Sequence, residues 1–331
     1  MRALLIALML LVAAAPAVRA EPAPANGAIV GTRAYAPPIE SYEALIERLK
    51  GAPRADPRDP EFDEAAFRRN RPPELFHAMR SGEVEVERIV YVSDGLKIEG
   101  YLVKPATRSG PLPVIVYARG GNRTFGEIGL PQVLDMVGWA RQGYVVLATN
   151  YRGSSRSEGS DEFGGADVND LLALFETART LPYADARNMY LIGASRGGMM
   201  VYRAIAEGAP VRAAAVVGGM ADLDASARQR PEIARNYAEM MPDHAEEAAN
   251  RFCRRSAVCW PEKLTVPLLL LHGESDWRVD VADARRLAEA VAAAGGSAEL
   301  VVYPGDDHML ADNGADGWAR ALALFAANRA G

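Results

Sequence analysis

The stretch that decides the fold is MYLIGASRGGMMVYRAIAEG, residues 189–208. Its first five residues are typical of a short buried strand, "ASRGG" of a sharp turn, and the rest of a helix that ends at Gly208. A strand, a tight turn with a central serine and a helix form a nucleophile elbow, which places Ser195 at the carboxyl edge of a sheet. The alternative is a glycine-rich packing turn with an incidental serine.

Short apolar runs alternate with helical patterns on both sides of this elbow. Strands are predicted at residues 113–118, 144–149, 189–193, 212–217, 267–271 and 299–303, and helices at 130–142, 166–180, 196–207, 280–293 and 316–328. Residues 84–105, in which "SDG" separates two strand-like runs, predict an antiparallel hairpin. The class is therefore α/β, with a mainly parallel sheet covered by helices on both faces.

The chain divides into three predicted parts. Residues 1–20 have a positive start at Arg2, an apolar run and small residues before position 21, as in a secretory signal peptide; an uncleaved anchor is the alternative. Residues 21–83 form a Pro-rich arm with helical patches at 41–50 and 61–80, and residues 84–331 form the catalytic domain. Within it, residues 219–263 are too long for an ordinary connection and predict a helical lid. We expect an exported protein, periplasmic or secreted, with no stable membrane insertion after cleavage.

Composition limits the partners. The net charge of −6 over 331 residues offers no basic surface for nucleic acid. The only two cysteines, Cys253 and Cys259, would meet an oxidising compartment after export, where they either pair, which requires a helix break between them, or stay as buried thiols. Two cysteines without a nearby histidine do not predict a zinc site. The oligomeric state is not predictable from these features.

A serine nucleophile needs a histidine base and a carboxylate, which in this topology follow the serine in the order acid, then histidine. His308 lies after the last predicted strand, in "VVYPGDDHML", and Asp276 after the preceding one, in "LLLLHGESDWRVD". Asp280 is the alternative acid, although it begins a helix and suits an N-cap. His272 is expected to pack or hydrogen-bond locally at its strand end.

The oxyanion formed during acyl transfer needs preorganised N–H donors. One is the backbone N–H of Arg196, directly after the nucleophile. The second is expected from the loop "RGGNR" after the strand at 113–118, at Gly121.

The sequence from about residue 84 to the end resembles the catalytic domain of the prolyl oligopeptidase family, within the α/β-hydrolase fold. The likeness rests on "VIVYARGG", "ATNYRGSSRSEG", "GASRGG", "VPLLLLHGESDWRV" and "YPGDDHML". It implies the same roles for Ser195, Asp276, His308, Gly121 and Arg196. Two departures stand out: the arm is too short for the β-propeller of larger members, and Arg196 replaces their usual aromatic residue.

Several arginines lie in loops expected near the carboxyl edge. Arg119 and Arg196, with Arg123, Arg152 and Arg156 nearby, could bind a negatively charged substrate. The alternative is an internal network with neighbouring carboxylates.

The sequence thus predicts an exported serine hydrolase that needs no metal or organic cofactor and cleaves amides or esters, as a peptidase acting on small peptides. A carboxylesterase is the alternative enzyme. A non-catalytic binding protein on a hydrolase fold is the alternative of a different class.

Overall fold

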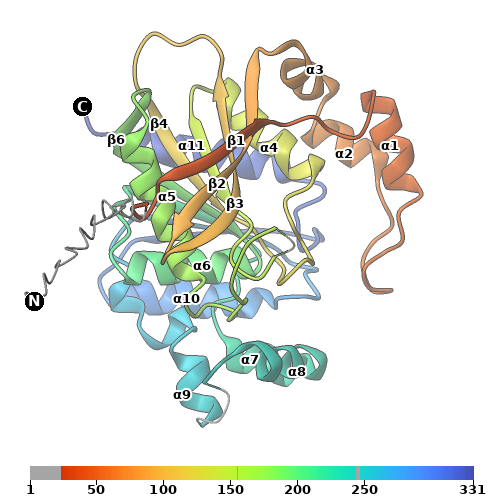
Figure 1. Ribbon diagram of the computed structural model, residues 1–331. Coiled ribbons are helices and arrows are strands. Elements are labelled where there is room, and N and C mark those ends of the chain that lie inside the picture. Colours follow the sequence, from red (N-terminus) through yellow and green to blue (C-terminus); the bar gives the residue numbers. More distant parts are fainter. Residues whose placement is uncertain (1–23, 155, 244–246) are drawn as a thin grey trace, which may run out of the picture.

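The computed structural model describes residues 24–154, 156–243 and 247–331, so the predicted signal peptide lies outside the described residues. Within these ranges nine strands form one sheet in the order β1-β2-β3-β5-β4-β6-β7-β8-β9 (Figure 1). Their bounds are β1 Ile29–Ala34, β2 Val84–Ser93, β3 Leu96–Pro105, β4 Leu112–Ala118, β5 Val145–Thr149, β6 Ala184–Ala194, β7 Ala213–Val217, β8 Leu268–Gly273 and β9 Ala298–Tyr303.

The sheet has an antiparallel part and a parallel part. Strands β1, β2, β3 and β5 pair antiparallel in turn, and β2 with β3 is the hairpin expected from "SDG". From β5 onward every neighbouring pair is parallel. The carboxyl ends of β4, β6, β7, β8 and β9 therefore meet at one edge, where open α/β sheets bind their ligands.

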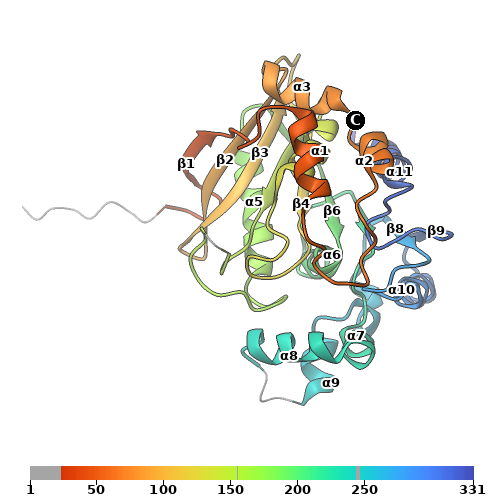
Figure 2. The same cartoon turned by 90° about the vertical axis from the view of Figure 1, so that its right-hand side faces the viewer.

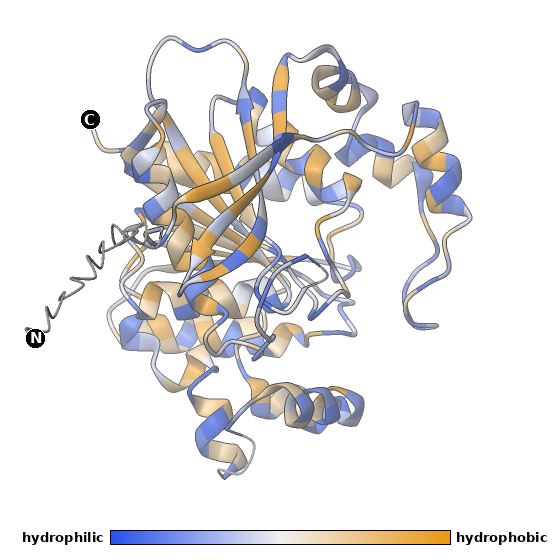
Figure 3. Cartoon of the chain, in the orientation of Figure 1, coloured by the Kyte–Doolittle hydropathy of each residue, from blue (hydrophilic) through white to orange (hydrophobic). Residues whose placement is uncertain are grey.

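Helices cover both faces of this sheet, because alternate strand residues point to opposite sides. In β4, Val114 and Val116 join the core beneath α5, α6 and α10, whereas Ile115 and Tyr117 join the core beneath α3, α4 and α11. Figure 3 shows hydrophobic residues concentrated along these strands. The helices are α1 Tyr42–Lys50, α2 Glu64–Asn70, α3 Pro73–Ser81, α4 Leu130–Arg141, α5 Val168–Thr180, α6 Arg196–Ala206, α7 Leu223–Gln229, α8 Pro231–Met240, α9 Ala248–Cys253, α10 Val281–Ala293 and α11 Gly314–Ala327.

The arm differs from its prediction in two ways. Residues 29–34 form β1, the edge strand, which has one glycine and mostly exposed side chains and so lacks the alternation that marks a half-buried strand. The helical patch predicted at 61–80 is two helices, α2 and α3, because Pro72 and Pro73 prevent a continuous helix between them.

Residues 219–263 contain α7, α8, α9 and the short 3-10 helices η1 (Ala257–Cys259) and η2 (Pro261–Lys263). Figures 1 and 2 show α7, α8 and α9 standing away from the sheet, at its lower end in both views. A disulfide joins Cys253 to Cys259, with the Cα atoms 5.6 Å apart. The bridge is compatible with the backbone because α9 ends at Cys253.

The described ranges contain no helix of the length and apolar character that crossing a bilayer requires.

Candidate active site

Ser195 lies between β6 and α6, on the turn that the sequence predicts. Its backbone has φ 57° and ψ −125°, a strained conformation for a residue with a side chain. A Cβ atom at Gly193 would come within 2.3 Å of the Gly197 carbonyl oxygen, and one at Gly197 within 2.0 Å of the Ala118 carbonyl oxygen. The turn therefore requires both glycines, and it holds Ser195 at the carboxyl edge of the sheet.

Asp276 and His308 meet at the same edge. Asp276 follows β8 and His308 follows β9, and the His308 Nδ1 atom lies 2.7 Å from Asp276 Oδ2. The other carboxylate oxygen, Oδ1, accepts hydrogen bonds from the backbone N–H groups of Arg278 at 2.8 Å and Val279 at 3.0 Å. The alternative acid, Asp280, instead caps α10 by accepting from the Ala282 N–H.

His272 bonds locally at the end of β8, as expected, and one of its partners is Asp276. Its ring is buried, and its Nε2 atom lies 3.2 Å from Asp276 Oδ2 and 2.9 Å from the Val279 carbonyl oxygen. Burial by itself would raise the pKa of Asp276, but hydrogen bonds from His272 and His308 outweigh it and hold this pKa well below its usual range. His272 therefore contributes to keeping Asp276 ionised.

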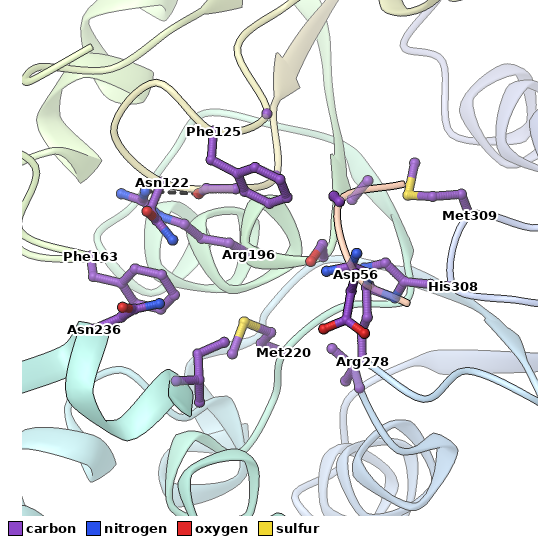
Figure 4. A pocket seen from close by; sticks show the side chains of 18 of the residues that line it. Asp56, Asn122, Phe125, Phe163, Arg196, Met220, Asn236, Arg278, His308 and Met309 are labelled. Atoms are coloured by element: carbon purple, nitrogen blue, oxygen red, sulfur yellow. Dashed lines mark hydrogen bonds between the residues drawn. The ribbon is translucent and has the colours of Figure 1, made fainter. Parts of the chain in front are cut away.

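Ser195 and His308 line one cavity of about 500 Å³. Within the described residues no hydrogen bond joins Ser195 Oγ to the ring of His308, and in unliganded sites such bonds are often long. Figure 4 shows His308 beside the cavity with Phe125, Phe163 and Met220 around it. The pocket thus combines a serine hydroxyl, an imidazole and apolar walls.

The two expected oxyanion donors lie beside Ser195. Gly121 and Arg196 both line the cavity, and the backbone N–H groups of both have no hydrogen-bond partner in the part of the chain that is described. Gly121 has φ +71°, and a Cβ atom there would come within 2.1 Å of the Phe125 carbonyl oxygen. The loop conformation that presents its N–H thus depends on glycine.

The structure favours an internal role for the Arg196 side chain. Its guanidinium is buried, donates to Asp161 Oδ2 at 2.7 Å and Oδ1 at 2.8 Å, and also pairs with Asp167. A further hydrogen bond of 2.9 Å reaches the Gly121 carbonyl oxygen. This guanidinium therefore ties the elbow to the loop that carries Gly121, and both of its terminal nitrogens donate to the protein itself.

Arg119 is engaged in the same way. Its buried guanidinium donates to the carbonyl oxygens of Asn150, Gly120, Phe125 and Arg123 at 2.7–3.1 Å. These contacts fix the loop that carries Gly121. Arg123, Arg152 and Arg156 each form ion pairs as well, with Glu239, with Asp94 and Asp170, and with Glu99.

Two walls of the cavity come from segments whose lining residues were not named from the sequence, although the first lies in the predicted lid. One is α8, which provides Ile233 and Asn236; the length of the 219–263 insertion was the only signal for it. The other is the loop between α1 and α2, which brings Ala55 and Asp56 to the cavity. The described residues contain no group of three or more His, Cys, Asp or Glu side chains arranged to hold a metal ion.

A twisted, mainly parallel sheet with helices on both faces and a serine on its strand-to-helix turn defines an α/β-hydrolase. The chain belongs to the prolyl oligopeptidase family, whose sequence profile matches residues 132–331, and it is a serine peptidase.

Two curated relatives illustrate the range of lengths in the family. The chain is 29% identical over 210 residues to an uncharacterized peptidase of Bacillus subtilis, YtmA. The aligned part covers 63% of this chain and 80% of YtmA. It is 25% identical over 239 residues to dipeptidyl-peptidase 5 of Porphyromonas gingivalis, covering 68% of this chain and 34% of that protein. The chain therefore spans about a third of the longer relative.

Solved structures show the same fold. An acylaminoacyl peptidase of Pyrococcus horikoshii matches with a TM-score of 0.63 and 20% identity, over 76% of this chain and 42% of that chain. A puromycin-hydrolyzing peptidase of Mycobacterium tuberculosis matches with a TM-score of 0.62 and 22% identity, over 71% of this chain and 37% of that chain.

Proposed function

We propose that this chain is an exported serine peptidase that cleaves small peptides through an acyl-enzyme. In this proposal Ser195 is the nucleophile, His308 the base and Asp276 the carboxylate that orients His308. The observation that carries the proposal is the His308–Asp276 pair at 2.7 Å, beside a cavity that both Ser195 and His308 line. The three residues follow three strand ends at one edge of the sheet, which supports a Ser-His-Asp mechanism.

In the first half of the reaction, Ser195 Oγ attacks the scissile carbonyl carbon while His308 Nε2 accepts the hydroxyl proton. Asp276 accepts a hydrogen bond from His308 Nδ1, which leaves Nε2 free to accept that proton, and its charge stabilises the imidazolium. The tetrahedral intermediate collapses, the C–N bond breaks, and His308 returns the proton to the leaving amine. In the second half, His308 takes a proton from a water molecule, which attacks the acyl carbon. The Ser195 ester bond breaks, Ser195 recovers its proton from His308, and the carboxylic acid product leaves.

The Gly121 and Arg196 N–H groups are assigned to the oxyanion. Both line the cavity beside Ser195 and neither is used by another acceptor within the described residues, so both can donate to a developing negative charge. The hydrogen bond from the Arg196 side chain to the Gly121 carbonyl oxygen supports this assignment, because it joins the two segments that carry the donors. Such preorganisation lowers the cost of reorganising the site during the reaction.

The export part of the proposal rests on residues 1–20, whose pattern is that of a signal peptide. The Cys253–Cys259 disulfide agrees with an oxidising compartment. Fractionation of cells that produce the full chain, with sequencing of the mature N-terminus, tests it. We expect cleavage near Glu21; an intact N-terminus in the cytosolic fraction would contradict export.

Fluorophosphonate labelling of the mature protein beside Ser195→Ala tests the chemistry, since the probe requires an activated serine. We expect labelling of the wild type only, and turnover of short aminoacyl arylamides. Turnover of p-nitrophenyl esters without arylamide cleavage would replace the small-peptide proposal with an esterase. Absence of labelling in folded protein would remove the nucleophile assignment.

A further inference from the structure

Residues 51–60, in the loop between α1 and α2, cross from the arm to the catalytic cavity. We call this segment the arm loop. Figure 2 shows it descending from α1 toward the level of α10. Ala55 and Asp56 of this loop line the same cavity as Ser195 and His308, and Figure 4 shows Asp56 in front of His308. The arm thus supplies one wall of the reaction chamber.

Asp59 binds the arm loop to the loop after β8, which carries Asp276, through a salt bridge with Arg278. We call this Asp59–Arg278 salt bridge the clasp. The Asp59 Oδ1 atom accepts hydrogen bonds from Arg278 Nε at 3.0 Å and Nη2 at 2.7 Å, and Oδ2 lies 2.5 Å from Nη2. Arg278 is two residues from Asp276, and its backbone N–H donates to Asp276 Oδ1. Asp59 Oδ2 also accepts from the Asp56 N–H at 3.0 Å, so one carboxylate shapes the arm loop and fixes it beside the cavity.

Arg58 extends the connection to the insertion. Its Nη2 atom lies 3.0 Å from a carboxylate oxygen of Glu232 in α8, and its guanidinium carbon lies 3.8 Å above the ring centre of Trp277. Arg230 stacks on the same ring at 5.0 Å. The arm loop, the loop that carries Asp276, and the start of α8 therefore meet around Trp277. Together they form one side of the cavity.

The two connections differ in their exposure to solvent. The side chains of Arg58 and Glu232 are 51% and 39% exposed, and those of Asp59 and Arg278 are 19% and 18% exposed. The exposed Arg58–Glu232 pair is weak and is screened by salt, whereas the bidentate Asp59–Arg278 pair is largely shielded from solvent and is the stronger connection. The Asp59–Arg278 pair is therefore the main contact that has to break when the arm loop is displaced.

We propose that the arm loop is a substrate-length filter of this peptidase, held over the cavity by the Asp59–Arg278 clasp. The inference rests on the proposed function. A cavity of about 500 Å³ takes a ligand of drug size beneath the closed loop. A longer peptide has to displace the arm loop, and the cost of breaking the clasp appears as a lower kcat/KM for that substrate.

The test uses Asp59→Asn and a series of N-blocked peptide arylamides that lengthens from one residue to about six. Replacing the carboxylate removes the charge of the clasp and keeps the size of the side chain. We expect the ratio of kcat/KM for long over short substrates to rise about 2- to 5-fold, the range expected for one partly exposed ion pair. A ratio equal to that of the wild type would overturn the proposal.

The matched control is Glu43→Gln. Glu43 is also an arm carboxylate paired with an arginine, Arg68, with Glu43 Oε1 and Arg68 Nη1 3.0 Å apart, but neither residue lines the cavity. The control variant should keep the wild-type ratio. If it shifts the ratio as much as Asp59→Asn, the effect comes from loosening the arm in general and the clasp has no specific role.

Two further measurements decide the matter if Asp59→Asn folds poorly. Ala55→Trp adds bulk on an exposed position of the cavity wall and should lower the ratio. Raising the salt from about 0.05 to about 0.5 M should raise the ratio in the wild type, because salt screens the exposed Arg58–Glu232 pair that also holds the arm loop. A ratio unchanged by both treatments would reject the filter. Ser195-dependent labelling and short-substrate turnover are measured on the same samples, so loss of the proposed function is recognised separately.

Discussion

At the scale of single residues, Asp276 has both carboxylate oxygens engaged, one toward His308 and one toward two backbone N–H groups. In Asp276→Asn the new amide donates toward His308 Nδ1 and places the imidazole proton on Nε2, which can then no longer act as a base. We expect kcat for a short arylamide to fall about 10⁴-fold with the fold retained.

Asp280→Asn is the matched control, because Asp280 is the neighbouring acid but caps α10. Because asparagine caps a helix about as well as aspartate, it should change stability by less than about 1 kcal/mol and keep kcat near the wild-type value. Equal losses of kcat in both variants would contradict the assignment of the acid.

Gly218, at the end of β7, faces the acid–histidine pair. It has φ +52°, and a Cβ atom there would lie 3.0 Å from His308 Nδ1 and 3.2 Å from Asp276 Oδ2. Gly218→Ala should therefore disturb the pair and lower kcat about 10- to 100-fold. Gly208→Ala shares the positive φ, at +87°, but meets no atom within 4 Å. It should cost about 1–2 kcal/mol of stability without changing kcat; the same kcat in both variants would show that the contact is harmless.

At the scale of elements, α10 begins with a buried acid. Burial raises the pKa of Asp283 to about 7, with Asp222 and Asp280 adding to the effect and Arg286 opposing it. The folded state therefore binds this proton more tightly than the unfolded state. The free energy of unfolding should fall as pH rises from about 4 to about 7 on account of this group, and stay low above that range.

Asp283→Asn removes this dependence. We expect the variant to be more stable than the wild type at pH 8, on the order of 1–3 kcal/mol, with a smaller difference near pH 5. Urea unfolding at both pH values measures it. Asp224→Asn removes an exposed carboxylate on α7 as the control. A stability difference that does not vary with pH would contradict a buried protonated acid.

The elements of the catalytic domain follow from sequence because hydrophobic periodicity is local. Every strand and helix predicted between residues 84 and 331 is present, with ends that differ by a few residues. The arm was less predictable: β1 lies at a sheet edge, where exposed side chains remove the alternating pattern, and the break at Pro72 divided one expected helix. Side chains outside a core need not be apolar at regular spacing, so such segments carry no hydrophobic periodicity from which to predict them.

At the scale of the whole molecule, Ser195, Asp276 and His308 could be proposed from the sequence because each lies close in sequence to a strand end. Parallel topology then brings those ends to one edge. The contribution of the arm loop could not be predicted, because its ion pairs join residues about 174 and 219 positions apart, Arg58 with Glu232 and Asp59 with Arg278. Internal pairing of Arg196 with Asp161 and Asp167 likewise depends on tertiary neighbours, so both readings of that arginine fitted the sequence.

The path of the arm has a consequence for split forms of the protein. The chain leaves the sheet at the end of β1 and returns at β2, and these two strands pair with each other. A cut within the arm loop would leave an amino-terminal piece that stays attached by the β1–β2 ladder and by the buried Tyr42, Leu45 and Ile46 of α1. The two pieces should therefore behave as one complementing heterodimer.

A protease recognition sequence inserted after Pro53 makes this measurable. After cleavage we expect two bands on a denaturing gel, one peak of unchanged volume in native size-exclusion chromatography, and a labelled Ser195. Separation of the pieces in native buffer would contradict it. One cut in the arm loop would then let longer peptides reach the cavity while both fragments stay bound, so the protein would work as a two-fragment enzyme.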